Sequence, residues 1–141
     1  MLTEHDIALV RASFAEVAPI KDTAADIFYD RLFAIAPSAR TLFPEDLAEQ
    51  KRKLMAMITV AVSGLDDLGA LAPAVQGLGA RHVGYGALPE HYQLVAEALL
   101  FTLRQGLGAG FTPEVEAAWT KVYGVLSQTM QAGAAQARAA E

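Results

Sequence analysis

Residues 47–65, LAEQKRKLMAMITVAVSGL, carry the repeat that decides the fold class. Apolar side chains recur every three or four residues along this stretch, as they do on one face of an α-helix. They are Leu47, Leu54, Ile58, Ala61 and Leu65. The polar exception on that face is Gln50. The spacing predicts a long helix over about residues 47–65 with one side buried.

Towards the N-terminus, prolines divide the helical pattern. Residues 43–46, Phe-Pro-Glu-Asp, predict a corner, and Pro37 begins a short helix over residues 37–42, because proline is tolerated in the first turn. The helix before it must end near Pro37, since the residue preceding a proline disfavours helical dihedral angles. Pro19 marks an earlier break, and Thr3 can cap the first helix.

Towards the C-terminus, three more helices are expected. Residues 71–85 form a helix interrupted by glycines, residues 84–89 form a turn, and residues 89–107 form the next helix. Thr112-Pro113-Glu114 combines a cap, a proline and an acid, which is a typical helix start. The Ala- and Gln-rich end after about Gln131 is expected to fray.

The chain therefore reads as an all-α protein of about seven helices. It has 141 residues, 53% of them hydrophobic and 19% charged, which suits one domain over residues 1–141 with a single core. No alternating strand pattern and no internal repeat is present. A four-helix bundle would need fewer helices of matched length, so an irregular helical fold is favoured.

Composition excludes several classes of function. The net charge is −5 and the one basic cluster, residues 51–53, lies within a helical pattern, so a nucleic-acid partner is not expected. The absence of cysteine excludes disulfides, thiolate zinc sites and iron–sulfur clusters. No apolar run reaches the roughly 20 residues of a membrane span, and residues 1–4 lack the pattern of a signal peptide. We expect a cytoplasmic protein.

A series of special residues runs through the helices. In order they are Phe28, Tyr29, Pro37, Phe43, Gln50, Leu54, His82, Tyr92, Trp119 and Tyr123. Their order and spacing resemble the globin family. The blocks that look like single-domain bacterial haemoglobins and the globin part of flavohaemoglobins are FYDRLF, APSARTLF, RKLM, GLGARHVGYG, HYQLV and AWTKVYGV. The resemblance implies a globin fold around a pocket for haem b, with dioxygen, nitric oxide and carbon monoxide as gas ligands.

His82 is the expected metal ligand. From the residue alone it is an ordinary histidine near a helix end, with His5 and His91 as rivals. The resemblance aligns His82 with the proximal haem ligand and places His91, the more serious rival, beyond the proximal pocket. A neutral imidazole is a good ligand for iron when its other nitrogen donates to a backbone carbonyl.

Tyr29, Gln50 and Leu54 are the expected distal, gas-binding residues. Without the resemblance, Tyr29 is one aromatic of a core stripe and Gln50 is a surface residue. The resemblance places both facing the bound gas, where a phenol or amide donor stabilises the negative charge that dioxygen gains on iron. Glutamine does not readily ligate iron, so a five-coordinate ferrous iron is expected.

Further residues are expected to contact the cofactor. The resemblance implies that Phe43 stacks on the haem. Without the resemblance, each residue of the expected pocket could equally be an ordinary core or surface residue. The expected haem contacts are Phe43, Lys53, Leu54, Arg81, His82, Tyr85, Tyr92 and Val95. Lys53 and Arg81 are included as cations that could meet the propionates.

The proximal side departs from the flavohaemoglobin pattern. Those proteins pair the proximal histidine with a tyrosine, here Tyr92, and with a glutamate on the last helix. The aligned position of the glutamate is Ala134. A carboxylate bonded to the histidine would raise its basicity, so strong peroxidase-like electron donation to iron is not expected.

Four functions remain to be weighed. Reversible dioxygen binding for storage, delivery or scavenging is the leading hypothesis. Nitric oxide dioxygenation is the alternative, and it would need a separate reductase, because no Rossmann-type glycine fingerprint or flavin domain follows the globin segment. A haem-based sensor would require a fused output domain. A haem-free helical interaction module would be excluded by a haem absorbance spectrum.

Overall fold

The computed structural model describes residues 2–84 and 89–140. These residues form six α-helices and three short 3-10 helices, and none of them lies in a β-strand. In chain order the elements are α1 (Glu4–Val17), η1 (Ala18–Ile20), α2 (Lys21–Ile35), η2 (Pro37–Leu42), α3 (Ala48–Ser63), α4 (Leu68–Gly84), α5 (Pro89–Leu107), η3 (Gly108–Gly110) and α6 (Pro113–Ala140). The all-α prediction is confirmed, and the short helix expected over residues 37–42 is a 3-10 helix.

The helix starts follow the local sequence signals. Thr3 and Asp6 form a capping box, in which each side chain accepts a hydrogen bond from the other residue's backbone N–H at 3.0 and 3.1 Å. At the start of α6, Thr112 Oγ1 accepts from Val115 N at 3.2 Å and Pro113 occupies the first helical position. Gly108 has φ +54°, so the turn between α5 and α6 uses a backbone conformation that favours glycine.

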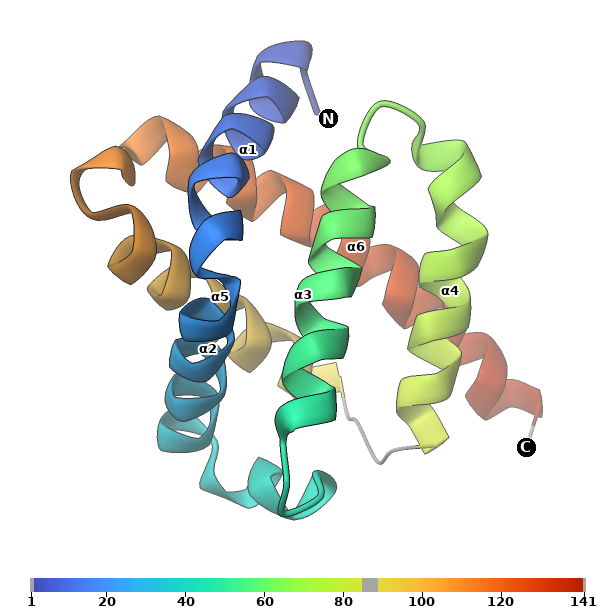
Figure 1. Ribbon diagram of the computed structural model, residues 1–141. Coiled ribbons are helices and arrows are strands. Elements are labelled where there is room, and N and C mark those ends of the chain that lie inside the picture. Colours follow the sequence, from blue (N-terminus) through green and yellow to red (C-terminus); the bar gives the residue numbers. More distant parts are fainter. Residues whose placement is uncertain (1, 85–88, 141) are drawn as a thin grey trace.

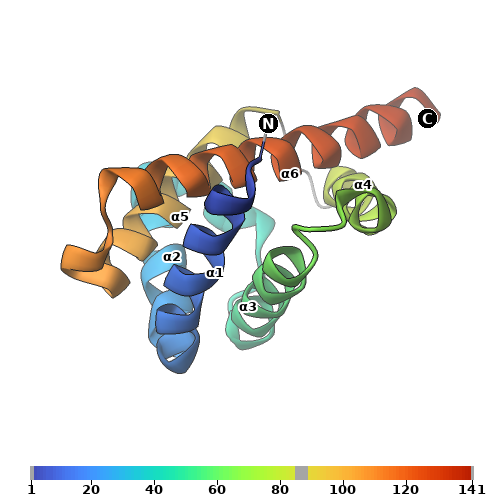
Figure 2. The same cartoon turned by 90° about the horizontal axis from the view of Figure 1, so that it is seen from above.

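Two clusters of buried side chains form the core. α6 crosses the whole molecule and packs against α1, α4 and α5, while α2 packs against α5 and α3 (Figures 1 and 2). The main core cluster joins α1, α3, α5 and α6, with Val10, Trp119 and Val122 among its buried residues. A second cluster around Phe28 and Tyr29 of α2 meets α5. This second cluster positions the candidate site.

The C-terminal part of α6 does not fray, which corrects the sequence-based expectation. The helix continues to Ala140, and Gly133 and Ala134 are buried. A Cβ at Gly133 would lie 2.0 Å from the carbonyl oxygen of Gln76, so α6 rests directly on the backbone of α4 here. Packing against α4 stabilises a segment whose sequence alone gives no such indication.

Helix α4 begins at Leu68, earlier than expected, and includes Pro73 within its length. It was expected to end in a turn over residues 84–89, most of which lies outside the described residues.

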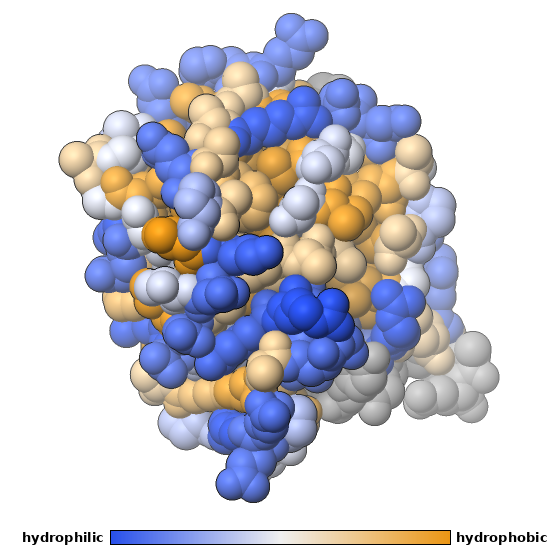
Figure 3. All heavy atoms as spheres, viewed as in Figure 1, coloured by the Kyte–Doolittle hydropathy of each residue, from blue (hydrophilic) through white to orange (hydrophobic). Residues whose placement is uncertain are grey.

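The face of the molecule in Figure 3 shows apolar atoms between α3 and α4, among hydrophilic side chains. Among the described residues, no helix is both long enough and apolar enough to cross a membrane.

Candidate functional site

Tyr29 lies in a cluster of aromatic rings. It is 6% exposed, and its ring centroid lies 5.1 Å from that of Phe28, 5.9 Å from that of Phe33 and 5.6 Å from that of Phe43. Phe28 and Phe43 contact it edge-on, an arrangement favoured by the charge distribution of aromatic rings. Helix α2 and the corner that begins at Phe43 therefore meet around the ring of Tyr29.

The Tyr29 hydroxyl donates a hydrogen bond to the main-chain carbonyl of Gln50 at 3.4 Å. Gln50 is in the first turn of α3 and is half-buried, and Leu54 follows one turn later and packs against the same aromatic cluster. The structure thus brings the three expected distal residues together. Lys51 strengthens this junction, because its Nζ lies 2.7 Å from Oδ1 of Asp26 on α2.

Burial raises the pKa of Tyr29 from 10.0 to about 12. An aromatic surrounding disfavours the phenolate, so the hydroxyl, a hydrogen-bond donor at neutral pH already at the ordinary pKa of 10.0, keeps its proton further into the alkaline range.

We therefore expect Tyr29 to ionise only near pH 12. Because the folded pKa lies above the unfolded value, its contribution to stability is fully present below pH 10 and is lost as the pH rises through 12. An alkaline titration of tyrosinate absorbance should show a high step that Tyr29→Phe removes. Loss of a step near pH 10 in that variant would contradict the assignment.

His82 lies in the last turn of α4 and is half-buried. Its Nδ1 lies 2.7 Å from the carbonyl oxygen of Leu78, one turn earlier. A carbonyl only accepts hydrogen bonds, so Nδ1 carries the proton, and in the neutral imidazole Nε2 then holds the lone pair that can bind a metal. This donor chemistry fits a haem iron. No group of three or more His, Cys, Asp or Glu side chains that could hold a metal ion occurs among the described residues.

The sequence model of the family described as Globin matches residues 26–130. This match extends from α2 into α6 and includes Tyr29, Gln50 and His82. The chain belongs to the globin family. As a globin it is a haem protein that binds small gas ligands, and the all-helical structure agrees with the globin fold.

Relatives of two kinds are similar to this globin. It is 30% identical over 130 residues to a flavohemoprotein of Bacillus subtilis (strain 168), covering 90% of this chain and 33% of that protein. It is 32% identical over 146 residues to a neuroglobin of Danio rerio, covering 94% of this chain and 92% of that protein. A flavohemoprotein of Vibrio cholerae is 31% identical over 131 residues. The chain thus spans about a third of the flavohemoproteins and nearly all of the neuroglobin.

The two rival histidines lie elsewhere. His5 is on α1, its side chain is 72% exposed, and its Nε2 lies 3.6 Å from Oε2 of Glu114 at the start of α6. His91 is in the first turn of α5 and is half-buried. Neither observation tests which histidine binds the iron, so the choice of His82 stays a prediction.

The other expected haem contacts are only partly brought together. Val95 packs against the aromatic cluster that contains Tyr29, whereas Lys53 and Arg81 are exposed. Neither cation takes part in an ion pair within residues 2–84 and 89–140. Tyr85 lies outside the described residues.

Helices α5 and α6 share a contact that sequence reasoning missed. Tyr92 is 8% exposed, and the Tyr123 hydroxyl of α6 donates to its main-chain carbonyl at 2.5 Å. Burial raises the pKa of Tyr123, so this donor also stays protonated. The positions of Tyr92 and Tyr123 in the sequence gave no indication that the two residues form a hydrogen bond. Ala134, which aligns with the glutamate of flavohaemoglobins, is 1% exposed, so a buried methyl group stands at this position instead of a carboxylate.

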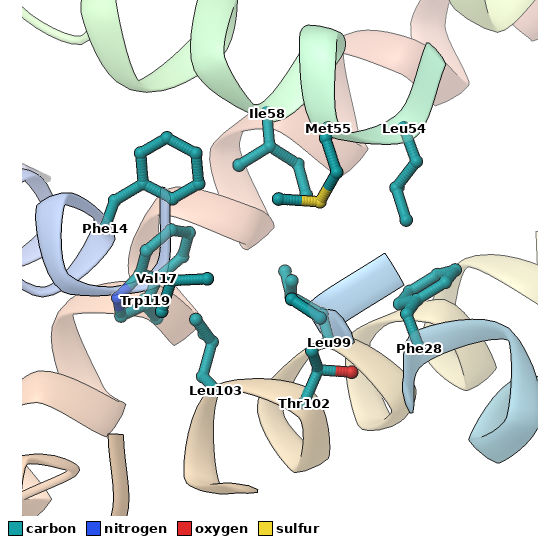
Figure 4. Close-up of a pocket in the computed structure, with 11 residues that line it drawn as sticks. Phe14, Val17, Phe28, Leu54, Met55, Ile58, Leu99, Thr102, Leu103 and Trp119 are labelled. Carbon is teal, nitrogen blue, oxygen red and sulfur yellow. The ribbon is translucent and has the colours of Figure 1, made fainter. Parts of the chain in front are cut away.

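A small apolar cavity adjoins the distal residues. Phe28 and Leu54 lie at one end of it and Phe14 and Trp119 at the other, as Figure 4 shows. The hydroxyl of Thr102 in its wall donates to the carbonyl of Ala98 at 2.8 Å. The cavity is therefore lined by apolar atoms, because this bond occupies the Thr102 hydroxyl.

Proposed function

We propose that this globin binds dioxygen reversibly at a five-coordinate ferrous haem b, for oxygen storage, delivery or scavenging in the cytoplasm. Residues 1–141 would act as one globin domain. The observation that carries the choice of dioxygen is the buried Tyr29 hydroxyl, which stays protonated and lies beside Gln50 in an aromatic cluster. Ferrous haem supplies the binding of diatomic gases, and dioxygen gains negative charge when it binds.

The distal residues would stabilise that charge. The bond from Tyr29 to the Gln50 carbonyl is long at 3.4 Å, so turning the hydroxyl towards a charged ligand costs little. The side-chain amide of Gln50 offers a second donor. Aromatic and aliphatic neighbours exclude water, and a hydrogen bond is stronger in such surroundings.

The remaining residues would hold the cofactor. Nε2 of His82 would bind the iron, because Nδ1 is committed to the Leu78 carbonyl. We propose that Phe43, Leu54, Tyr92, Val95 and Tyr85 contact the porphyrin. Lys53 and Arg81 would meet the propionates as exposed cations.

Nitric oxide dioxygenation is the second proposal, supported by the similarity to flavohemoproteins at 30–31% identity. Converting nitric oxide and dioxygen to nitrate leaves the iron ferric, so each turnover consumes one electron from a separate reductase. Stopped-flow mixing of the dioxygen-loaded protein with nitric oxide tests this activity. Rapid nitrate formation that continues only with added reductant would support the enzyme, and its absence would leave gas binding alone.

The ferrous, gas-free protein is expected to be five-coordinate. The distal side presents Tyr29 and Gln50, and neither a protonated phenol nor an amide is a good ligand for ferrous iron. The absorbance spectrum of the dithionite-reduced protein at neutral pH should be that of high-spin five-coordinate haem. A low-spin six-coordinate spectrum would refute this prediction and point to an internal ligand.

A further inference from the structure

Helix α4 carries His82 and is held in place mainly by α6. It contains Gly69, Gly77, Gly79 and Pro73, all of low helix propensity, so it depends on its packing partner. In Figures 1 and 2, α4 lies at one side of the molecule with α6 crossing it. The position of His82 is therefore set by where α6 holds α4.

Gly79 and Gly133 lie where the two helix backbones touch. A Cβ at Gly79 would stand 1.9 Å from the carbonyl oxygen of Met130, and a Cβ at Gly133 would stand 2.0 Å from that of Gln76. The contact is reciprocal, since each glycine faces the residue three positions before the other glycine. In glycine a hydrogen takes the Cβ direction, which gives Cα–H to carbonyl contacts typical of close helix interfaces.

The same turn of α4 orients the imidazole. Gly79 directly follows Leu78, whose carbonyl binds Nδ1 of His82 at 2.7 Å. We propose that Gly79 and Gly133 are positioning residues for His82, and that their crossing fixes the depth at which α4 presents the imidazole to the haem. This inference rests on the proposed role of His82 as the axial ligand.

Alanine at Gly79 would force the helices apart by about 1.5 Å, because ordinary contact begins at 3.4 Å. The obstructing atoms belong to the backbone, so no side-chain rotation relieves the clash. Metal–ligand bond lengths hold to about 0.2 Å. With haem bound, a displacement of this size would therefore weaken the bond between His82 and the iron, or draw the haem along with α4.

The two helices supply matched control positions. A Cβ at Gly77 of α4 would meet only Nη1 of Arg81, at 3.6 Å, and a Cβ at Gly124 of α6 would meet nothing within 4 Å. Gly77→Ala and Gly124→Ala thus make the same chemical change on the same helices without a backbone clash.

The test compares Gly79→Ala and Gly133→Ala with these two controls in the haem-loaded, ferrous, gas-free protein. The readouts are the iron–histidine stretching frequency in resonance Raman spectra and the rate of haem transfer to a haem-free acceptor globin. The crossing variants should shift the frequency beyond the spread of the controls and lose haem about tenfold faster. Parent-like values in both crossing variants would overturn the proposal.

A second measurement separates positioning from general packing. In a His82→Gly background, free imidazole can bind the iron without attachment to α4. Adding Gly79→Ala should then leave the iron–imidazole frequency unchanged, and an equal shift in both backgrounds would overturn the proposal. Loss of the whole helical fold in the crossing variants, rather than of haem retention alone, would also overturn it.

Failure of the proposed function would look different. If the parent and the controls took up no haem, or if the iron–histidine band survived in His82→Ala, His82 would not be the axial ligand and the inference would fall with it.

Discussion

Replacing His82 by alanine is expected to abolish stable haem binding. The imidazole is held in the tautomer with its lone pair on Nε2 by the 2.7 Å bond from Nδ1 to the Leu78 carbonyl. Removing a group that merely orients a ligand typically costs 10- to 100-fold in metal affinity, so removing the ligand itself should accelerate haem loss by more than about 100-fold. The measurement is the rate of haem transfer to an excess of a haem-free acceptor globin, followed in the Soret band.

His91→Ala is the matched control for this prediction. It also removes an imidazole, from the first turn of α5, and should retain haem at close to the parent rate. If haem loss accelerated in His91→Ala and not in His82→Ala, the assignment of the axial ligand would be wrong. Added imidazole should restore a haem spectrum to His82→Ala, because the free ligand replaces the missing bond.

Removing the Tyr29 hydroxyl is expected to accelerate dioxygen dissociation by about 10- to 150-fold. A hydrogen bond to a charged ligand is worth about 1.5–3 kcal/mol, and 1.4 kcal/mol corresponds to a factor of ten. The bond that Tyr29 makes to Gln50 without a gas is long, at 3.4 Å, so little of this gain is spent on breaking it. Tyr29→Phe keeps the ring and its three aromatic contacts, and stopped-flow displacement of dioxygen measures the rate.

Carbon monoxide provides the control ligand, because it carries less charge when bound and should respond much less to Tyr29→Phe. Gln50→Leu tests the second donor in the same way. Equal acceleration for the two gases would indicate altered access or packing instead of a lost hydrogen bond. Unchanged dioxygen dissociation in both variants would remove the distal hydrogen-bond proposal and leave Tyr29 as a core residue.

Local sequence signals predicted the helix starts well. Thr112 and Pro113 begin α6, Thr3 caps α1, and α5 spans residues 89–107 as expected. Caps and prolines act within one helical turn, so their effect is independent of the rest of the chain. The prediction that the end of α6 frays was wrong, because the stability of that segment does not depend on local signals. Its stability comes from contact with α4, and the contact pairs Gly133 with a residue 57 positions earlier, Gln76.

The candidate site also has some features that the sequence indicated and others that only the structure shows. The order of Tyr29, Gln50 and His82 resembles the globin family, and the family match over residues 26–130 confirms that the chain belongs to it. Sequence could not show that Tyr29 meets the main chain of Gln50, or that Lys51 pairs with Asp26 beside them. Both contacts depend on how α2 and α3 cross.

The sequence by itself determined the helical class, most helix boundaries and the family, and it predicts which residues would contact haem and gas. These depend on local propensity, on helical periodicity and on residue identity in order along the chain. Only the tertiary structure decided the burial that raises the pKa of Tyr29 and the backbone contact between Gly79 and Gly133. Hydrogen-bond partners, burial and helix separation belong to pairs of elements, and packing between elements sets distances that no single stretch of sequence contains.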